Sequence, residues 1–264
     1  MGRISQIIRY ILLNRFIADW CTDVNLLNLQ NGVFSIKDRQ LITDSSYYFR
    51  YMLPYKYIPL PANSCFATLC PNLSKWFHFV TYGEKELITY LFCYLRAILL
   101  RDISSQTFIE LVGGGGTGKS TFINIASALC GLNNTATSSL NNIERNRFET
   151  ASLVGKFLLV ITDSAEYTGK KAILKALTGG DSIRYEQKGK DISDPYYPRL
   201  LVIIATNEVL SLGDHTTGLA RRRIIIPFNR KYIGLPRHLL SVINDQFVGE
   251  FTSELSLVLS FNSF

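Results

Sequence analysis

The chain has 264 residues, of which 47% are hydrophobic and 19% are charged. Such a chain can bury a sizeable core, which excludes intrinsically disordered and fibrous proteins. Lysine and arginine outnumber aspartate and glutamate by 28 to 21, so the net charge is +7 and a polyanionic partner is favoured. The longest apolar run, residues 87–100, contains Arg96 and is shorter than the roughly 20 residues of a membrane span. We therefore expect a soluble protein without a membrane partner.

The cysteines and the N-terminus indicate the compartment. Five cysteines stand at positions 21, 65, 70, 93 and 130, an odd number without the spacing of a zinc site or a secreted disulfide framework. They predict free thiols in a reducing, intracellular environment. The apolar stretch near Ile7 is interrupted by Arg9 and lacks a small-residue cleavage site, so it is not a secretory signal. A surface helix is favoured there over a transit peptide.

The first part of the chain, residues 1–75, carries no glycine-rich signal. Prolines at positions 54, 59, 61 and 71 exclude one continuous helix. The composition predicts a small, irregular and mainly helical N-terminal region. From residue 76 to residue 101, apolar residues recur at helical spacing, which predicts a helix leading into the next domain.

The next segment alternates short apolar runs with helical stretches. The runs of strand length are FIELV at 108–112, FLLVI at 157–161, LLVIIAT at 200–206 and RRIIIPF at 222–228. This alternation predicts an α/β domain with a mostly parallel sheet covered by helices. We place the domain at residues 76–240 and expect residues 241–264 to form a closing C-terminal helix.

A glycine-rich loop lies between the first of these runs and the helical stretch KSTFINIASAL. It fits the pattern Gly-x4-Gly-Lys-[Ser/Thr], in which backbone amides at a helix N-terminus form an anion nest for phosphate. The pattern favours a nucleotide-binding loop, in which the lysine reaches the β- and γ-phosphates and the serine hydroxyl ligates Mg²⁺. The predicted nucleotide-binding residues are Gly113, Gly114, Gly115, Gly116, Thr117, Gly118, Lys119, Ser120 and Thr121.

Polar residues follow two of the other predicted strands. Asp163 comes directly after the run that begins at Phe157, where an acid would hold Mg²⁺ together with Ser120. Asn207 follows the next run and could orient water and sense the γ-phosphate. Each has a structural alternative, a helix N-cap for Asp163 and a turn asparagine for Asn207. Glu166 is a weaker candidate for the metal.

Three consecutive arginines, 221–223, precede the last apolar run. Neighbours in a strand point to opposite sides, so the three cannot share one purpose. In a ring, one of them could enter the ATP site of the neighbouring subunit as an arginine finger. A solvated basic edge is the alternative.

Five motifs in order carry a family resemblance. They are LVGGGGTGKSTF from Leu111, RFETASLVGKFLLVITDS at 147–164, LKALTGGDSIRYEQK at 174–188, IIATNE around Asn207 and GLARRRIIIPF at 218–228. With NGVFSI from Asn31 and the Pro-Asn-x-x-x-Trp stretch ending at Trp76, they resemble the superfamily III helicases of the phage and plasmid primase-helicase branch. Similar proteins occur in cyanobacteria and in red-algal plastids or plasmids.

The resemblance implies a ring-forming, AAA-like ATPase, usually a hexamer, that unwinds DNA with ATP and Mg²⁺. Lys119 and Ser120 match the family's nucleotide loop. Asp163 matches its metal-side acid and Asn207 its sensor. An arginine finger completes the catalytic residues that the resemblance implies, which are otherwise Lys119, Asp163 and Asn207.

Arg221 and Arg222 match the paired arginines of the family, and of the two we choose Arg222 as the finger. The segment between acid and sensor matches a hairpin that projects into the ring channel, which makes Lys188 and Lys190 the predicted DNA contacts, or else solvated surface lysines. Tyr185 could stack on a base or pack within the hairpin.

The chain departs from the family in three places. Ala165 stands where relatives often have a second acid, no primase domain precedes the helicase part, and the chain ends at Phe264, where relatives continue into a winged-helix module. A primase would then come from another chain. The sequence favours a helicase for replication of a plasmid, phage or organellar element. The alternatives are an ATPase that packages or remodels nucleic acid and a truncated DNA-binding ring protein.

Overall fold

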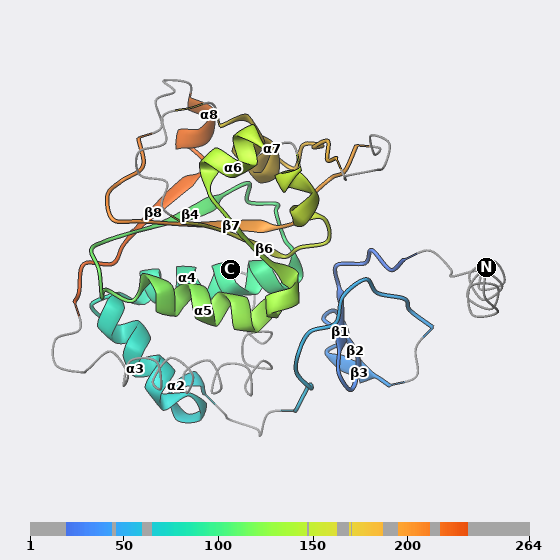
Figure 1. The fold of residues 1–264 in the computed structure, drawn as a ribbon. Coiled ribbons are helices and arrows are strands. Elements are labelled where there is room, and N and C mark those ends of the chain that lie inside the picture. Colours follow the sequence, from blue (N-terminus) through green and yellow to red (C-terminus); the bar gives the residue numbers. More distant parts are fainter. Residues whose placement is uncertain are drawn as a thin grey trace, which may run out of the picture.

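The protein is described here from a computed structural model. The structure describes residues 20–43, 46–59, 65–146, 148–162, 169, 171–186, 195–211 and 217–231. Figure 1 shows a central sheet with helices on both faces and a small second sheet to one side.

The central sheet has five strands that run parallel to one another. They are β4 (Phe108–Val112), β5 (Thr135–Ser138), β6 (Leu158–Thr162), β7 (Leu201–Thr206) and β8 (Arg223–Pro227). Their order in the sheet is β5-β6-β7-β4-β8, so β7 lies between β4 and β6. The inner strands are nearly continuous apolar runs because both faces of the sheet are covered. The predicted α/β class is confirmed.

Helices cover the two faces unequally (Figure 1). One face carries α4 (Lys85–Leu100) and α5 (Lys119–Cys130). The other carries the shorter α6 (Leu140–Arg145), α7 (Ala172–Gly179) and α8 (Thr217–Ala220). Two 3-10 helices, η1 (Leu132–Asn134) and η2 (Glu149–Leu153), lie in the connections.

Each face has its own hydrophobic core. Alternation along β4 sends Ile109 and Leu111 into the core beneath α4 and α5, and Phe108 into the core beneath α6 and α7. We call these the α4/α5 core and the α6/α7 core. The first is the larger and also contains residues of the N-terminal region.

The N-terminal region differs from the expectation of a mainly helical segment. Residues 20–59, where described, hold three antiparallel strands and no helix: β1 (Leu26–Leu29), β2 (Gly32–Ser35) and β3 (Gln40–Ile42). The sequence signal for this small sheet is the two-residue turn between β1 and β2, which is followed by Gly32. Gly32 has a φ of +145°, a value that only glycine adopts readily. The three strands are too short to show an alternation of apolar and polar residues in the sequence.

The helix expected over residues 76–101 is two helices. They are α3 (Pro71–Val80), which follows the short α2 (Phe66–Leu69), and α4. The break has a backbone cause, because Tyr82 and Gly83 have φ values of +56° and +77°, outside the right-handed helical region.

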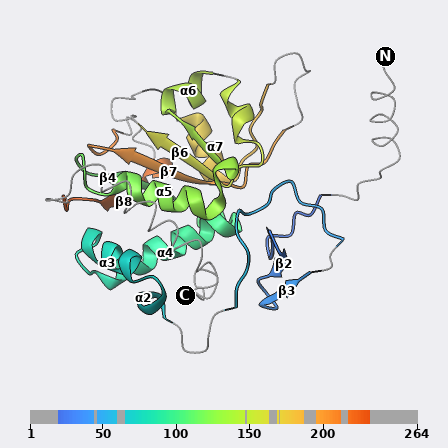
Figure 2. The same ribbon diagram turned by 60° about the horizontal axis from the view of Figure 1, so that its bottom comes forward.

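The small sheet lies beside the C-terminal end of α5 in both views (Figure 2). The segment after β3 makes the contacts. The ring of Tyr51 meets that of Phe157 edge to face at 4.7 Å, and the Tyr55 hydroxyl donates a hydrogen bond to the Leu129 carbonyl. The predicted closing helix at 241–264 lies outside the described residues.

Candidate nucleotide-binding site

The glycine-rich loop joins the end of β4 to the start of α5, as the pattern predicts. At Gly113, an added Cβ would lie 2.0 Å from the Phe228 carbonyl oxygen, so a side chain would displace the backbone after β8. Gly118 has φ of +100° and an added Cβ would lie 3.3 Å from the Trp76 ring. Both ends of the loop are therefore restricted to glycine by close packing and backbone conformation.

The middle of the loop is open. An added Cβ at Gly114 or Gly115 would meet no described atom within 4 Å, and both residues are exposed. The Thr117 hydroxyl donates to the Gly114 carbonyl at 2.9 Å, which holds the turn closed. The loop at Gly114 and Gly115, which leads to the N-terminus of α5, thus borders open space. The dipole of the helix favours an anion near this end.

Lys119 lies across this loop. Its Nζ donates to the Gly113 carbonyl, to the Gly114 carbonyl at 2.9 Å and to Asn207 Oδ1 at 3.4 Å. Partial burial lowers the pKa of Lys119, because it removes water from the ammonium group. The lysine is held on neutral oxygens that a phosphate could replace.

Asn207 reaches the loop because of the strand order. β7 is the direct neighbour of β4, so the residue after β7 emerges beside the loop that follows β4. The structure therefore brings Lys119 and Asn207 together.

The predicted acid cannot be placed in the same way. Asp163 and Glu166 lie outside the described residues, as do Lys188 and Lys190. β6 ends at Thr162, which is paired with Ala205 of β7, two residues before Asn207. Ser120 is exposed in the first turn of α5.

The three consecutive arginines have three different environments. Arg221 is exposed. Arg222 is half-buried, and its Nη1 donates to the Lys175 carbonyl of α7 at 2.8 Å and to the Thr178 hydroxyl at 3.5 Å. Arg223 forms an ion pair with Glu110. The sequence expectation that the three cannot share one purpose agrees with this arrangement.

Glu110 is a residue that the sequence analysis did not single out. It is fully buried in β4, and its Oε1 accepts hydrogen bonds from the Thr206 hydroxyl at 3.1 Å and the Leu210 amide at 2.6 Å. A signal was present, because a carboxylate in the middle of the apolar run FIELV needs a buried partner.

The two ends of the segment between α7 and β7 lie side by side and pair in antiparallel orientation. Ile183 bridges Tyr196, and the rings of Tyr185 and Tyr196 meet edge to face at 6.1 Å. Tyr185 is half-buried in this contact, as in the alternative that the sequence analysis left open for it. Residues 187–194, which include both predicted DNA-contacting lysines, lie outside the described residues.

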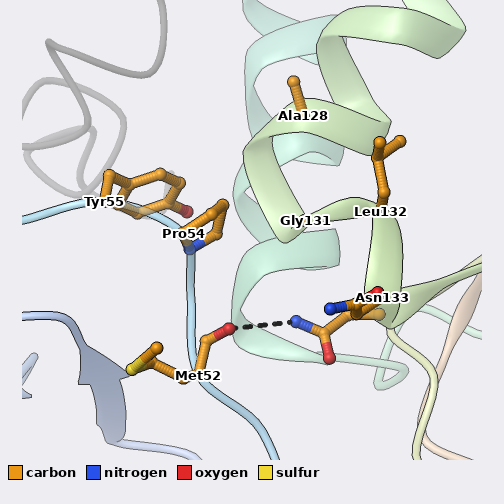
Figure 3. A pocket seen from close by; sticks show the side chains of 8 residues that line it. Met52, Pro54, Tyr55, Ala128, Gly131, Leu132 and Asn133 are labelled. Atoms are coloured by element: carbon orange, nitrogen blue, oxygen red, sulfur yellow. Dashed lines mark hydrogen bonds between the residues drawn. The ribbon is translucent and has the colours of Figure 1, made fainter.

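A hollow of about 490 Å³ lies at the far end of α5 (Figure 3). Its lining includes Met52 and Tyr55 from the N-terminal region and Gly131 and Leu132 after α5. The Asn134 amide donates to the Met52 carbonyl across it at 3.5 Å. α5 has 12 residues, so the hollow is roughly 18 Å from the glycine-rich loop and is separate from it.

The described residues show neither a membrane-spanning helix nor a metal-binding cluster. No helix among them is long and apolar enough to cross a membrane. They also contain no cluster of three or more histidine, cysteine, aspartate or glutamate side chains that could hold a metal ion. The five cysteines, all within the described part of the chain, form no disulfide bond with one another.

Comparison with known proteins matches two family models to different parts of the chain. Residues 111–223 match a family of unknown function, DUF5906. Residues 1–81 match a family described as D5 N terminal like. Each match covers less than half of the chain.

An uncharacterized mitochondrial protein of Marchantia polymorpha, ymf20, is 33% identical over 99 residues, which are 38% of this chain and 59% of that protein. Among solved structures, the apo C-terminal region of NrS-1 aligns with a TM-score of 0.56 at 12% identity, over 73% of this chain and 46% of that one. The chain therefore spans about half the length of these relatives.

The structure of JCV helicase aligns with a TM-score of 0.46 at 19% identity, over 76% of this chain and 56% of that one. A score this low does not by itself establish a common fold. The chain shares its fold with the C-terminal region of NrS-1, and its first 81 residues match the D5 N-terminal-like model. The superfamily III helicase resemblance and its plastid, plasmid or phage type stay predictions from the sequence motifs.

Proposed function

We propose that this chain is the ATPase part of a DNA helicase that hydrolyses ATP between the subunits of a ring. The observation that carries the proposal is the contact of Lys119 with both the glycine-rich loop and Asn207. This contact joins the glycine-rich loop, which can bind phosphate, to the Asn207 amide at the end of the neighbouring strand. Nucleotide hydrolysis requires both kinds of group. The helicase-like fold and the net charge of +7 support a nucleic-acid substrate.

In the proposed site, the amides of residues 114–118 bind the phosphates of ATP at the N-terminus of α5. Lys119 exchanges the Gly113 and Gly114 carbonyls for phosphate oxygens, so its charge is available without a large movement. The Asn207 amide, already next to Lys119, orients the attacking water. Preorganised polar groups of this kind act on charge that develops during the reaction.

The proposed metal is Mg²⁺, held by Ser120 and Asp163. An exposed hydroxyl in the first turn of α5, directly after a loop that can admit phosphates, fits this role. When bound, Mg²⁺ would neutralise charge on the β- and γ-phosphates.

The arginine finger is proposed to be Arg221. Arg222 is the finger predicted from the sequence, but its guanidinium is engaged with α7 in its own subunit. Arg221 is exposed and available to a neighbour. Lys188 and Lys190 are the proposed contacts to the translocated strand, and the ring is proposed to be a hexamer.

The proposed setting is replication of an organellar, plasmid or phage element. The similarity to a mitochondrial protein of Marchantia polymorpha supports an organellar element. A separate chain would supply any primase.

The first experiment measures ATP hydrolysis, with and without single-stranded DNA, for the wild type, Lys119→Ala and the control Lys85→Ala. Lys85 is an exposed lysine at the start of α4, so the control removes the same charge away from the loop. We expect Lys119→Ala to abolish turnover and Lys85→Ala to retain it. Normal turnover in Lys119→Ala would refute the nucleotide site.

A second experiment identifies the finger by mixing subunits. Lys119→Ala mixed with Arg221→Ala should recover part of the ATPase activity, because some interfaces then pair an intact loop with an intact finger. No recovery despite confirmed co-assembly would argue against Arg221. Lys119→Ala mixed with Arg222→Ala is the parallel test of the original choice.

Strand displacement distinguishes the helicase from the two alternatives. An ATPase that remodels or packages nucleic acid would hydrolyse ATP without separating strands. A non-catalytic ring protein would change its gel-filtration mass with ATP and hydrolyse none.

A further inference from the structure

Glu110 occupies an unusual place for a carboxylate. It lies in the middle of β4, and its partners in register on the two flanking strands are Ile204 of β7 and Ile225 of β8. None of its surface is exposed. Removing a carboxylate from water is unfavourable unless charge and hydrogen bonds compensate it.

The compensation comes from two places that are distant in sequence. Arg223 at the start of β8 supplies the opposite charge. The Leu210 amide and the Thr206 hydroxyl supply hydrogen bonds from the end of β7 and the loop that follows it. Glu110 therefore attaches the 207–210 loop to β4.

Stability alone is a weak explanation for this arrangement. A buried ion pair can often be replaced by apolar side chains of similar size without loss of stability. What apolar side chains cannot replace is the acceptor for the Leu210 amide. Between the two Glu110-bound positions, Thr206 and Leu210, stands Asn207.

We propose that Glu110 and Arg223 are positioning residues that hold the 207–210 loop so that the Asn207 amide faces Lys119. Glu110 binds the loop on both sides of Asn207, and Arg223 holds the carboxylate in the orientation that does so. The inference deepens the proposed function, on which it rests, and neither residue need touch the nucleotide.

Two double variants provide a matched test. Glu110→Leu with Arg223→Met replaces the ion pair by apolar side chains and removes the acceptor. Glu110→Gln with Arg223→Met also removes both charges but retains a side-chain oxygen for the Leu210 amide. The two proteins differ in one side chain and carry the same charge.

We expect the Leu/Met variant to lose about tenfold or more in kcat with KM for ATP nearly unchanged, because a small displacement of a catalytic group has a large effect on rate. The Gln/Met variant should recover most of this loss. Adding Asn207→Ala to the Leu/Met variant should lower kcat little further, since both changes act through one group. Equal kcat in the two double variants, or a full additional loss with Asn207→Ala, would overturn the proposal.

Hydrogen exchange at residues 207–211 gives a readout that needs no ATP. The Leu210 amide should exchange faster in the Leu/Met variant than in the Gln/Met variant or the wild type. Unchanged exchange would overturn the attachment of the loop. If the wild type lacked ATPase activity, the proposed function would fail, while this measurement would still decide whether Glu110 holds the loop. If the Leu/Met variant did not fold, Thr206→Val and Glu110→Gln alone would provide the same comparison of exchange.

Discussion

The face of the central sheet beneath α4 and α5 is covered by aliphatic and aromatic side chains, whereas the face beneath α6 and α7 also contains a buried ion pair. On the first face, Ile109 and Leu111 of β4 meet the aromatic and aliphatic side chains of the helices. On the second, Glu110 of the same strand meets Arg223, and Arg222 binds the end of α7. The two faces of one strand therefore have different chemistry.

This difference separates two tasks. Apolar packing is non-directional and stabilises the α4/α5 core, on which the N-terminal region also rests. Hydrogen bonds and ion pairs are directional, so the other face can hold particular loops in particular orientations. The loop carrying Asn207 is one of them. Changes on the first face should therefore affect stability, and polar changes on the second should affect the site.

The largest expected effect is that of Phe92→Ala in the α4/α5 core. The Phe92 ring is buried and meets the rings of Phe66 at 4.7 Å and Phe77 at 4.6 Å. Its removal should destabilise the protein by about 3–5 kcal/mol in urea unfolding. Turnover per folded molecule should remain normal. A loss below about 1 kcal/mol, or a fall in kcat of the folded protein, would contradict the division between the faces.

A smaller effect is expected for Arg222→Ala on the other face. The variant removes a charged donor from the Lys175 carbonyl and should destabilise the protein by about 1.5–3 kcal/mol. Arg221→Ala is the matched control, with a change within about 0.5 kcal/mol, because its side chain is exposed. Urea unfolding of both variants is the measurement. Equal stability of the two would show that the contact with α7 contributes nothing.

Tyr55→Phe tests how the N-terminal region is joined to the α4/α5 face. The Tyr55 hydroxyl satisfies the Leu129 carbonyl, one of the last carbonyls of α5 that lack a partner within the helix. Losing this bond should reduce stability by about 1 kcal/mol. Tyr47→Phe, which changes a tyrosine that is 48% exposed, should leave stability unchanged. Identical unfolding curves for both variants would show that the hydrogen bond of Tyr55 does not hold the N-terminal region to α5.

The smallest effect concerns cysteine reactivity. Burial raises the pKa of Cys130, on the α4/α5 face, to about 11, whereas hydrogen bonds from Thr68 lower the pKa of the exposed Cys65. Iodoacetamide at pH 8 should therefore alkylate Cys65 first and Cys130 only after unfolding, as measured by peptide mass spectrometry. Thr68→Val should move the onset of Cys65 alkylation to higher pH. Early alkylation of Cys130 would show that this core opens readily.

The raised pKa of Cys130 also has a consequence for stability. The folded state keeps the proton to about pH 11, while the unfolded thiol loses it near 9.0. The contribution of this group to stability is therefore present below pH 9.0 and is lost as the pH rises toward 11. Cys130→Ala should remove this part of the alkaline loss of stability.

The sequence by itself determined the α/β class and the glycine-rich loop. Both depend on local patterns: strand-length apolar runs alternating with helical ones, and glycines at positions such as Gly118, where backbone conformation admits little else. The small N-terminal sheet was missed because its strands of three or four residues are too short for a periodic signal. Only its turn before Gly32 was distinctive.

The tertiary structure decided which residues meet. Glu110 is 96 positions from Thr206 and 100 from Leu210, and no local pattern connects them. The strand order places β7 beside β4 and so brings Asn207 to Lys119. The same holds for the arginines, which are identical in type and adjacent in sequence. Their different environments arise from the strands and helices packed around them, because an ion pair or a hydrogen bond to a helix carbonyl forms only where the fold supplies the partner.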